Sequence, residues 1–148
     1  MLSAVNVADE DTDLDDVGGG YAEELDDMVE QITNLVVLGM KNFCSSEAIL
    51  NRACLVLHNL SQSPDYLPVL LWTPHCYQML EWCGTNHSTD TVLLRSASST
   101  LGRIQAYLSQ HEDEREKFVQ SLQREQQERR QQRESRTDEQ ILASSASL

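Results

Sequence analysis

The sequence of 148 residues is poor in aromatic side chains, with two Phe, two Trp and four Tyr, and it has no long apolar run. Its longest nearly apolar stretch, residues 67–72, is far shorter than the roughly 20 residues that a membrane-spanning helix needs. Acids, and no basic segment with an apolar run, follow the first few residues, so neither a signal peptide nor a mitochondrial presequence is indicated. This composition predicts an aliphatic, helical core.

Positive charge is absent from residues 1–30, which hold 11 of the 24 acidic residues and no Lys or Arg. The remaining residues hold 13 acids and 11 bases, so the net charge of −13 is concentrated at the N-terminus. An acidic chain repels phosphate backbones and anionic lipids, which argues against nucleic-acid and membrane-surface partners. With little apolar surface, residues 1–21 are expected to be disordered, with a Gly linker at residues 18–20. The alternative is an acidic arm that docks on a basic partner or covers the chain's own groove.

Cysteine is scarce, and the four Cys residues are read as reduced thiols, which predicts a cytoplasmic or nuclear protein. The only metal-like cluster consists of His75, Cys76, Cys83 and His87. On a helix, Cys76 and Cys83 would lie about 10 Å apart, which is too far for two thiolates on one zinc ion. We therefore expect core thiols and surface histidines, with no metal and no cofactor.

A catalytic constellation is also missing. Cys54 and His58 are four residues apart, but no orienting group or oxyanion site accompanies them. The glycines at residues 18–20 lack the Lys and Ser/Thr of a phosphate loop. We expect no enzyme, because an enzyme would need an activity that depends on Cys54 or His58.

Apolar spacings of three and four residues predict amphipathic helices at residues 23–43, 47–60, 91–108 and 112–122. The first of these helices carries Leu25, Met28, Val29, Ile32, Leu35, Val36 and Phe43. Pro64 and Pro74 open two shorter helices, 65–72 and 75–83, and Gly84 closes the second. Residues 123–140 contain no apolar side chain, so they predict a solvent-exposed helix that cannot form a coiled coil and frays from about residue 135.

Two segments repeat at an offset of 44 residues. Placing Ala53 on Ala97 (97 − 53 = 44) also aligns Leu57 with Leu101 and Leu60 with Ile104. The helix before each copy follows the same offset, with Leu35 on Met79 and Val36 on Leu80. A period of this length that carries two helices is typical of HEAT and armadillo arrays.

The order of a short helix (64–72), a middle helix (74–83) and a long third helix (91–108) resembles an armadillo repeat. The sequence LHNLS at residues 57–61 is similar to the family's third helix, in which an Asn precedes a Leu. The resemblance covers about residues 23–122 and implies an all-α fold, a short armadillo-like α–α superhelix. It divides the chain into a disordered acidic segment (1–21), armadillo-like repeats (22–122) and a polar helix with a frayed tail (123–148).

The resemblance also implies a candidate site. Asn59 matches the Asn that, in peptide-binding members of the family, bonds the backbone of an extended ligand. Leu55 stands where nuclear-import adaptors carry a Trp, and Arg103 takes the Asn position in the second copy, so recognition of basic import signals is not implied. The candidate protein-binding groove consists of Leu55, His58, Asn59, Ser99 and Arg103, and the alternative is that these are ordinary polar positions on an exposed face.

A second candidate surface is aromatic. Tyr66, Trp72, Tyr77 and Trp82 cluster on the short and middle helices, where they either pack between repeats or form a binding patch.

Fewer than three repeats are present, whereas about three are needed to bury the apolar faces of a solenoid. The expected function is a non-enzymatic scaffold or adaptor that binds a protein partner. The alternative is a subunit whose exposed repeat end docks into a larger complex or a homo-oligomer.

Overall fold

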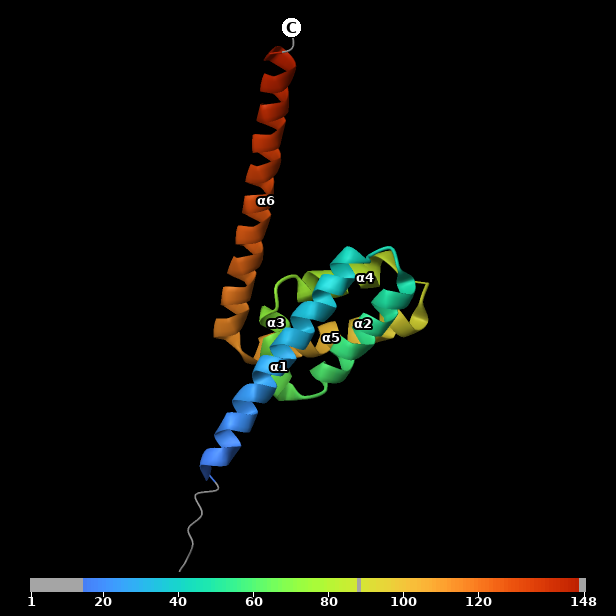
Figure 1. Cartoon of the computed structure of the whole chain (residues 1–148), viewed down its shortest axis with the longest axis vertical. Helices are drawn as coiled ribbons and strands as arrows, with labels where there is room; N and C mark the ends of the chain where they lie inside the picture. The colour runs from blue at the N-terminus through green and yellow to red at the C-terminus, as the bar shows by residue number, and fades with distance from the viewer. Residues whose placement is uncertain (1–14, 88, 147–148) are drawn as a thin grey trace, which may run out of the picture. The chain divides into compact units, whose positions relative to one another are not determined.

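The computed structural model describes residues 15–87 and 89–146, and these residues confirm the all-α prediction, with no strand among them. The helices are α1 (Asp15–Asn42), α2 (Glu47–Ser61), the 3-10 turn η1 (Pro64–Tyr66), α3 (Leu67–Trp72), α4 (Cys76–Asn86), α5 (Thr91–Gln110) and α6 (Glu112–Ala146) (Figure 1). Pro64 and Pro68 both lie in first turns, where the missing N–H of proline costs no hydrogen bond. The segment between α2 and α4 is therefore one short turn and one short helix, as predicted.

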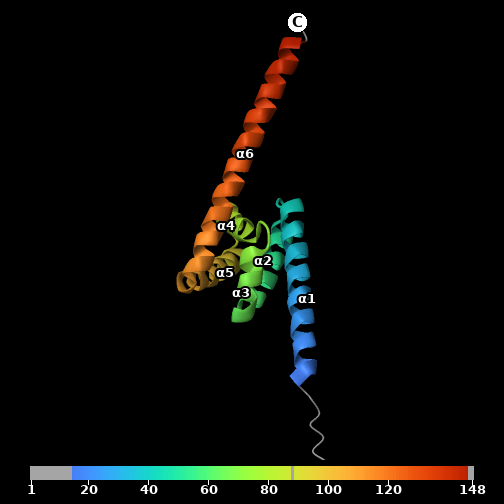
Figure 2. The same ribbon diagram turned by 90° about the vertical axis from the view of Figure 1, so that its left-hand side faces the viewer.

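The described residues form two compact units, one that ends at Ile104 and one that starts at Gln105, so the boundary falls within α5. In the first unit, α1 packs against α2, α3 and α4, while α3 also packs against α2 and α4 (Figure 2). The largest fully buried apolar side chains of this unit are aliphatic: Met40, Leu50, Leu57, Leu70, Leu80, Leu93 and Ile104.

The amphipathic character predicted for residues 47–60 is seen in α2, where Leu50, Ala53, Cys54 and Leu57 are buried and Leu60 is half-buried. In α5 the buried positions are Leu93, Ala97, Ile104 and Leu108, with Ser96 and Thr100 between them. Val92, by contrast, is 53% exposed. The reason is helical phase, since a stripe at spacings of three and four that passes through Leu93 and Ala97 leaves Val92 on the outside.

Two helix ends lie elsewhere than predicted. Helix α1 begins at Asp15, ahead of the start predicted near residue 23. Residues 1–14 of the predicted disordered segment lie outside the described residues. Gly84 does not close α4, which continues to Asn86 and ends where the His87 N–H donates to the Cys83 carbonyl.

The second unit comprises the end of α5 and the whole of α6. Tyr107 Oη donates a 2.9 Å hydrogen bond to Glu114 Oε1, and the Tyr107 ring stacks on His111 at a centroid distance of 4.1 Å. Phe118 is the one residue of α6 that is fully buried. The helix continues to Ala146, so the fraying expected from residue 135 is absent up to that residue. Gln, Glu and Arg dominate this stretch, and all three are strong helix formers.

Candidate docking surface

Helix α1 buries one narrow face in the first unit. Val29, Thr33, Val37 and Met40 are buried, and their spacings of four, four and three residues place them on one side of the helix. The Thr33 hydroxyl donates a 2.7 Å hydrogen bond to the Val29 carbonyl, so this buried polar group is satisfied within the helix. This face fixes the rotation of α1 about its own axis.

A second apolar face of α1 is left exposed. We call it the α1 stripe, and it consists of Tyr21, Leu25, Met28, Ile32 and Leu35. Tyr21 is 64% exposed and Leu35 is 69% exposed. At 3.6 residues per turn, the stripe lies roughly a third of a turn around the helix from the buried face. Of the apolar residues that predicted an amphipathic helix here, only Val29 is fully buried, because the apolar arc is wider than the surface that the rest of the unit covers.

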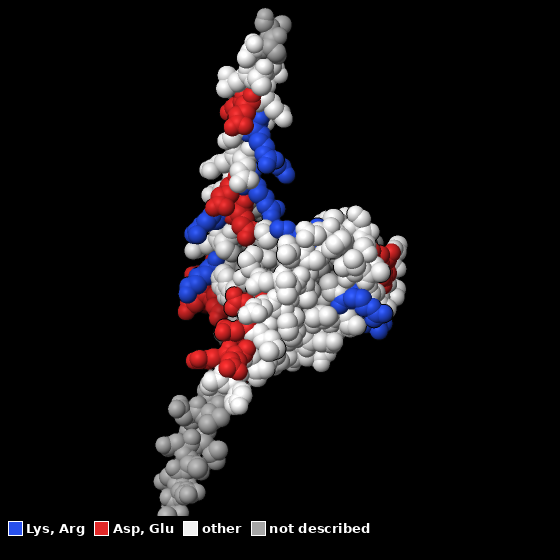
Figure 3. Space-filling model, in the orientation of Figure 1, with Lys and Arg blue, Asp and Glu red and all other residues white. Residues whose placement is uncertain are grey.

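The α1 stripe leads into a hollow between α1 and α2, which we call the α1–α2 groove. It measures about 490 Å³ and is lined by Leu35, Val36, Gly39, Ala48, Ile49, Arg52, Ala53 and Val56. Arg52 is the only charged residue among these lining residues. Figure 3 shows the face over α1 and α2 turned toward the viewer as mostly uncharged. Monomeric proteins rarely leave apolar surface of this kind uncovered unless it binds something.

The 44-residue offset of the sequence extends to the helix ends in the structure. Helix α1 ends at Asn42 and α4 ends at Asn86, while α2 begins at Glu47 and α5 begins at Thr91. The helix N-caps follow the same offset. Ser46 Oγ accepts from the Ile49 N–H, and Asp90 Oδ1 accepts from the N–H groups of Val92 and Leu93. The helix ends and caps of α1–α2 and of α4–α5 thus lie 44 residues apart. We call α1–α2 the first half of the first unit, and α4 with α5 up to Ile104 the second half.

The groove residues have buried counterparts in the second half. Adding 44 to each position pairs Val36 with Leu80, Gly39 with Cys83, Ile49 with Leu93 and Val56 with Thr100. Each of these four counterparts is 0% exposed, whereas Ile49 is 39% exposed and Val56 is 38% exposed. The same positions are thus covered in one half and uncovered in the other.

Contacts from α2 to the second half account for this difference. The Asn51 amide donates to both carboxylate oxygens of Asp90, at 3.3 and 3.0 Å. Arg103 Nη1 donates to Ser61 Oγ at 3.4 Å. The thiols of Cys54 and Cys83 are hydrogen-bonded to each other. The second half therefore packs against the first, whereas in the described residues of this unit nothing packs against the equivalent face of the first half.

The predicted groove around Asn59 is only partly assembled. Arg103 and His58 come together through Ser61, whose hydroxyl donates a 2.7 Å hydrogen bond to the His58 carbonyl. Asn59 is exposed, and Leu55, His58, Ser99 and Arg103 are half-buried. Arg103 takes the position of the second ligand-binding Asn, and its hydrogen bond to Ser61 links the two halves. No residue of this set lines the α1–α2 groove.

The four predicted patch aromatics differ in exposure. Trp72 at the end of α3 is 44% exposed, whereas Tyr66, Tyr77 and Trp82 are half-buried. The Trp82 ring meets the edge of His87 at a centroid distance of 5.4 Å. A binding role for these aromatic residues therefore stays a prediction.

Three of the four thiols are buried. Cys54, Cys76 and Cys83 are 0% exposed, and Cys44 between α1 and α2 is partly exposed. Burial raises the pKa of Cys76 to about 12, and the hydrogen bond that the Cys54 thiol donates to Cys83, together with burial, raises the pKa of Cys54. Within residues 15–87 and 89–146, no group of three or more His, Cys, Asp or Glu side chains could hold a metal ion. The described helices also include none with the length and apolar character that crossing a bilayer requires.

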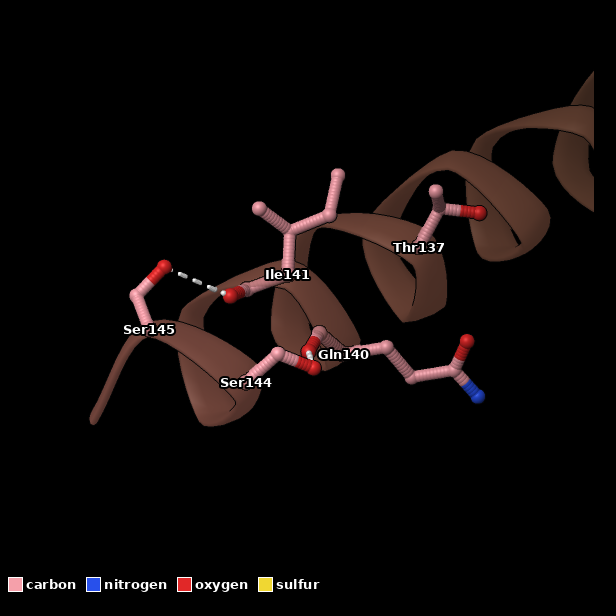
Figure 4. A pocket seen from close by; sticks show the side chains of 5 residues that line it. All are labelled: Thr137, Gln140, Ile141, Ser144 and Ser145. Carbon is pink, nitrogen blue, oxygen red and sulfur yellow. Dashed lines mark hydrogen bonds between the residues drawn. The ribbon is translucent and has the colours of Figure 1, made fainter. Parts of the chain in front are cut away.

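A shallow hollow near the end of α6 offers no comparable site. It is lined by Thr137, Gln140, Ile141, Ser144 and Ser145, all from one helix (Figure 4). Ser145 Oγ donates a 2.9 Å hydrogen bond to the Ile141 carbonyl, so this hydroxyl is used within the helix. Because no second element faces these residues, the hollow is the surface of a helix.

Sequence reasoning placed Leu35 and Val36 in the repeat but did not single out Ile49, Arg52 or Val56 as site residues. The available signal was the 44-residue offset, which pairs Ile49 with Leu93 and Val56 with Thr100.

No protein-family model matches the chain, and neither the curated proteins nor the solved structures include a match.

Proposed function

We propose that this chain is a non-enzymatic protein-interaction module, built as a short armadillo-like array, that docks onto another protein chain through the α1–α2 groove and the α1 stripe. The observation that carries the proposal is the difference between the two halves of the first unit. Ile49 and Val56 are exposed, whereas the residues at the same repeat positions, Leu93 and Thr100, are covered by a neighbouring helix pair. A repeat face that lacks its neighbour is the surface on which a partner restores the missing burial.

The chemistry of the groove fits protein docking better than it fits a small-molecule site. Its lining is almost wholly aliphatic, with one charged residue, Arg52, and it contains no nucleophile or acid–base pair. Burying one Leu or Ile side chain in an interface contributes about 1.5–3 kcal/mol, so a few such contacts support a specific complex. The reduced thiols fit a protein of the cytoplasm or nucleus.

The adaptor groove around Asn59 is the less supported site within this function. Binding of an extended peptide there would use Asn59 and Arg103, and Arg103 already bonds Ser61 across the two halves. The surface that is uncovered and apolar lies on the other side, on α1 and the outer face of α2.

A photoreactive amino acid at Val56 tests the proposal in the cell that makes the full chain. We expect a covalent protein adduct that is lost with Leu35→Asp and retained with Arg103→Ala. Leu35 is 69% exposed, so its replacement leaves the core intact. An adduct that is lost with Arg103→Ala and survives Leu35→Asp would assign binding to the Asn59 groove, and the absence of any protein adduct would refute docking at this face.

A further inference from the structure

Helix α6 carries positive charge on one side of its exposed part. Four of the five Arg residues in residues 124–136 lie within an arc of roughly 120° around the helix, and we call them the Arg face: Arg129, Arg130, Arg133 and Arg136. All four are exposed. Outside this arc lie the acids of the same part of α6, which are Glu125, Glu128, Glu134, Asp138 and Glu139.

Like charges surround the middle of the Arg face. Side chains three and four residues apart are neighbours on a helix, and at these positions Arg133 has Arg129, Arg130, Arg136 and Thr137. Neighbours of the same sign destabilise a helix, and no acid at these positions offsets them. The Arg face is therefore suited to a partner that brings carboxylates.

The first half of α1 has the opposite pattern. At the same four relative positions, Asp27 has Glu23, Glu24, Glu30 and Gln31, so three acids stand where Arg133 has three Arg. Four exposed acids lie within an arc of roughly 100°, and we call them the acidic face: Glu23, Asp26, Asp27 and Glu30. None of them belongs to the buried face of α1 or to the α1 stripe.

We propose that the chain forms a weak, salt-sensitive dimer in which the acidic face of one copy docks on the Arg face of the other. Both faces repeat at intervals of four and three residues, in Glu23, Asp27 and Glu30 and in Arg129, Arg133 and Arg136. When the two helices lie side by side, each Arg of this series has an acid opposite it. Each copy supplies both faces, so a twofold arrangement forms the contact twice.

Neither face is neutralised by an ion pair within the part of the chain that the structure describes. The ion pair found there joins Arg115 Nη2 to Glu112 Oε1 at 3.3 Å, and it involves no residue of the two faces. Nucleic acid fits the Arg face less well, because the net charge of −13 and the acids that flank the arc repel phosphate groups. An acidic helix contacts the Arg arc alone.

The exposure of these charges sets the strength of the dimer. An ion pair that stays in contact with water contributes little by itself, and the net charges of the two copies repel each other. We therefore expect association only at high protein concentration, and we expect added salt to abolish it. The dilute chain is a monomer.

Light scattering on a sizing column, with the full chain at increasing concentration, tests the proposal. In about 0.1 M salt the mass should rise from 16.7 kDa toward twice that value. In about 1 M salt, where the Debye length is only about 3 Å, it should stay at the mass of one chain. Reversal of the Arg face should raise the dissociation constant about tenfold or more, through the combined changes Arg129→Glu, Arg133→Glu and Arg136→Glu. Reversal of the acidic face should do the same, through Glu23→Arg, Asp27→Arg and Glu30→Arg.

Mixing the two reversed chains separates docking of the faces from a general effect of charge. One reversed chain carries acids on both faces and the other carries Arg on both. Each should therefore be monomeric alone, and the mixture should form a heterodimer. Their net charges are −19 (−13 − 6) and −7 (−13 + 6), so both chains stay negative and their net charges do not attract each other.

A matched control reverses three exposed bases outside both faces, through Arg95→Glu, Lys117→Glu and Arg124→Glu. This chain also has a net charge of −19 (−13 − 6), but it should keep most of the dimerisation. Arg and Glu are both strong helix formers, so the circular-dichroism spectra of all the variants should remain helical.

A wild-type chain that stays monomeric at every concentration in the lower salt would overturn the proposal. So would a dimer that survives the higher salt, a mixture that gives no heterodimer, or a control that weakens the dimer as much as reversal of the Arg face does. The two faces include no residue of the α1–α2 groove or the α1 stripe, so Leu35→Asp should leave the dissociation constant unchanged. Loss of this dimer would therefore leave the proposed docking at the groove intact.

Discussion

Asn51 of α2 and Asp90, the residue before α5, form a direct link between the two halves of the first unit. Asn51 Nδ2 lies 3.0 Å from Asp90 Oδ2 and 3.3 Å from Asp90 Oδ1. The same carboxylate caps α5, because Oδ1 accepts from the backbone N–H groups of Val92 and Leu93. One side chain thus starts α5 and links it to α2.

The first prediction concerns this link. Asn51→Ala should lower the melting temperature by a few degrees, since it removes the contact to Asp90 and leaves the helix cap in place. Asp90→Ala should lower it further, because it removes both. In a double-mutant cycle the two changes should be less than additive, since they share one interaction. Strict additivity in thermal unfolding would show that the Asn51–Asp90 contact contributes nothing.

The second prediction is the pH dependence of the same contact. The Leu93 N–H and the Asn51 amide hold the pKa of Asp90 below its usual value. A carboxyl group whose folded pKa is lowered stabilises the fold above its unfolded pKa of about 3.9, and this stabilisation is lost as the pH falls through the folded pKa. The difference in unfolding free energy between the wild type and Asn51→Ala should be constant near neutral pH and shrink below about pH 4. A difference that grows on acidification would contradict this account.

The third prediction concerns the thiols. In the folded protein, a thiol reagent such as Ellman's reagent should react rapidly with Cys44 alone, because Cys54, Cys76 and Cys83 are buried and the pKa of Cys76 is raised to about 12. Unfolding in guanidinium should expose all four thiols. Cys44→Ser is the control and should abolish the rapid reaction. A second rapidly reacting thiol in the native Cys44→Ser variant would show that the core around α2 and α4 opens readily.

The fourth prediction compares two leucines. Leu57→Ala, at a position that is 0% exposed, should cost about 2–5 kcal/mol in the free energy of unfolding because it leaves a cavity. Leu35→Ala removes the same atoms from a side chain that is 69% exposed, and should change the stability of the monomer by about 0.5 kcal/mol or less. Urea unfolding at low protein concentration measures both. Equal losses at the two positions would mean that the α1 stripe is covered within a single chain.

Much of the fold was readable from the sequence because local signals agree with the packing. The apolar stripe of α2 is buried as the spacing predicts, Asp90 caps α5, and the offset of 44 residues extends to the helix ends. The start of α1 was misplaced because three glycines and several acids resemble a linker. Gly84 was read as a helix end, but glycine inside a helix costs only about 1 kcal/mol.

The docking surface was harder to predict for a physical reason. The spacing of apolar residues indicates that one side of a helix is buried, but it does not indicate which element or partner covers that side. Leu25, Met28, Ile32 and Leu35 have the same pattern as a core-facing stripe, and only the three-dimensional arrangement shows that they are exposed. The sequence alone does not identify Arg52 as a site residue, because only the structure shows that it lines the groove.

The fifth prediction concerns α6, in which every residue from 123 to 146 except Glu125 is exposed. Cutting the chain after Glu125 should remove the circular-dichroism signal of 21 helical residues (146 − 125) without lowering the midpoint of thermal unfolding, because residues 126–146 are all exposed. Cutting before Glu112 is the matched comparison, and it should lower the midpoint because it also removes the buried Phe118 and the bond from Tyr107 to Glu114. If the shorter cut alone lowered the midpoint, the exposed part of α6 would have to support the fold through contacts of its own.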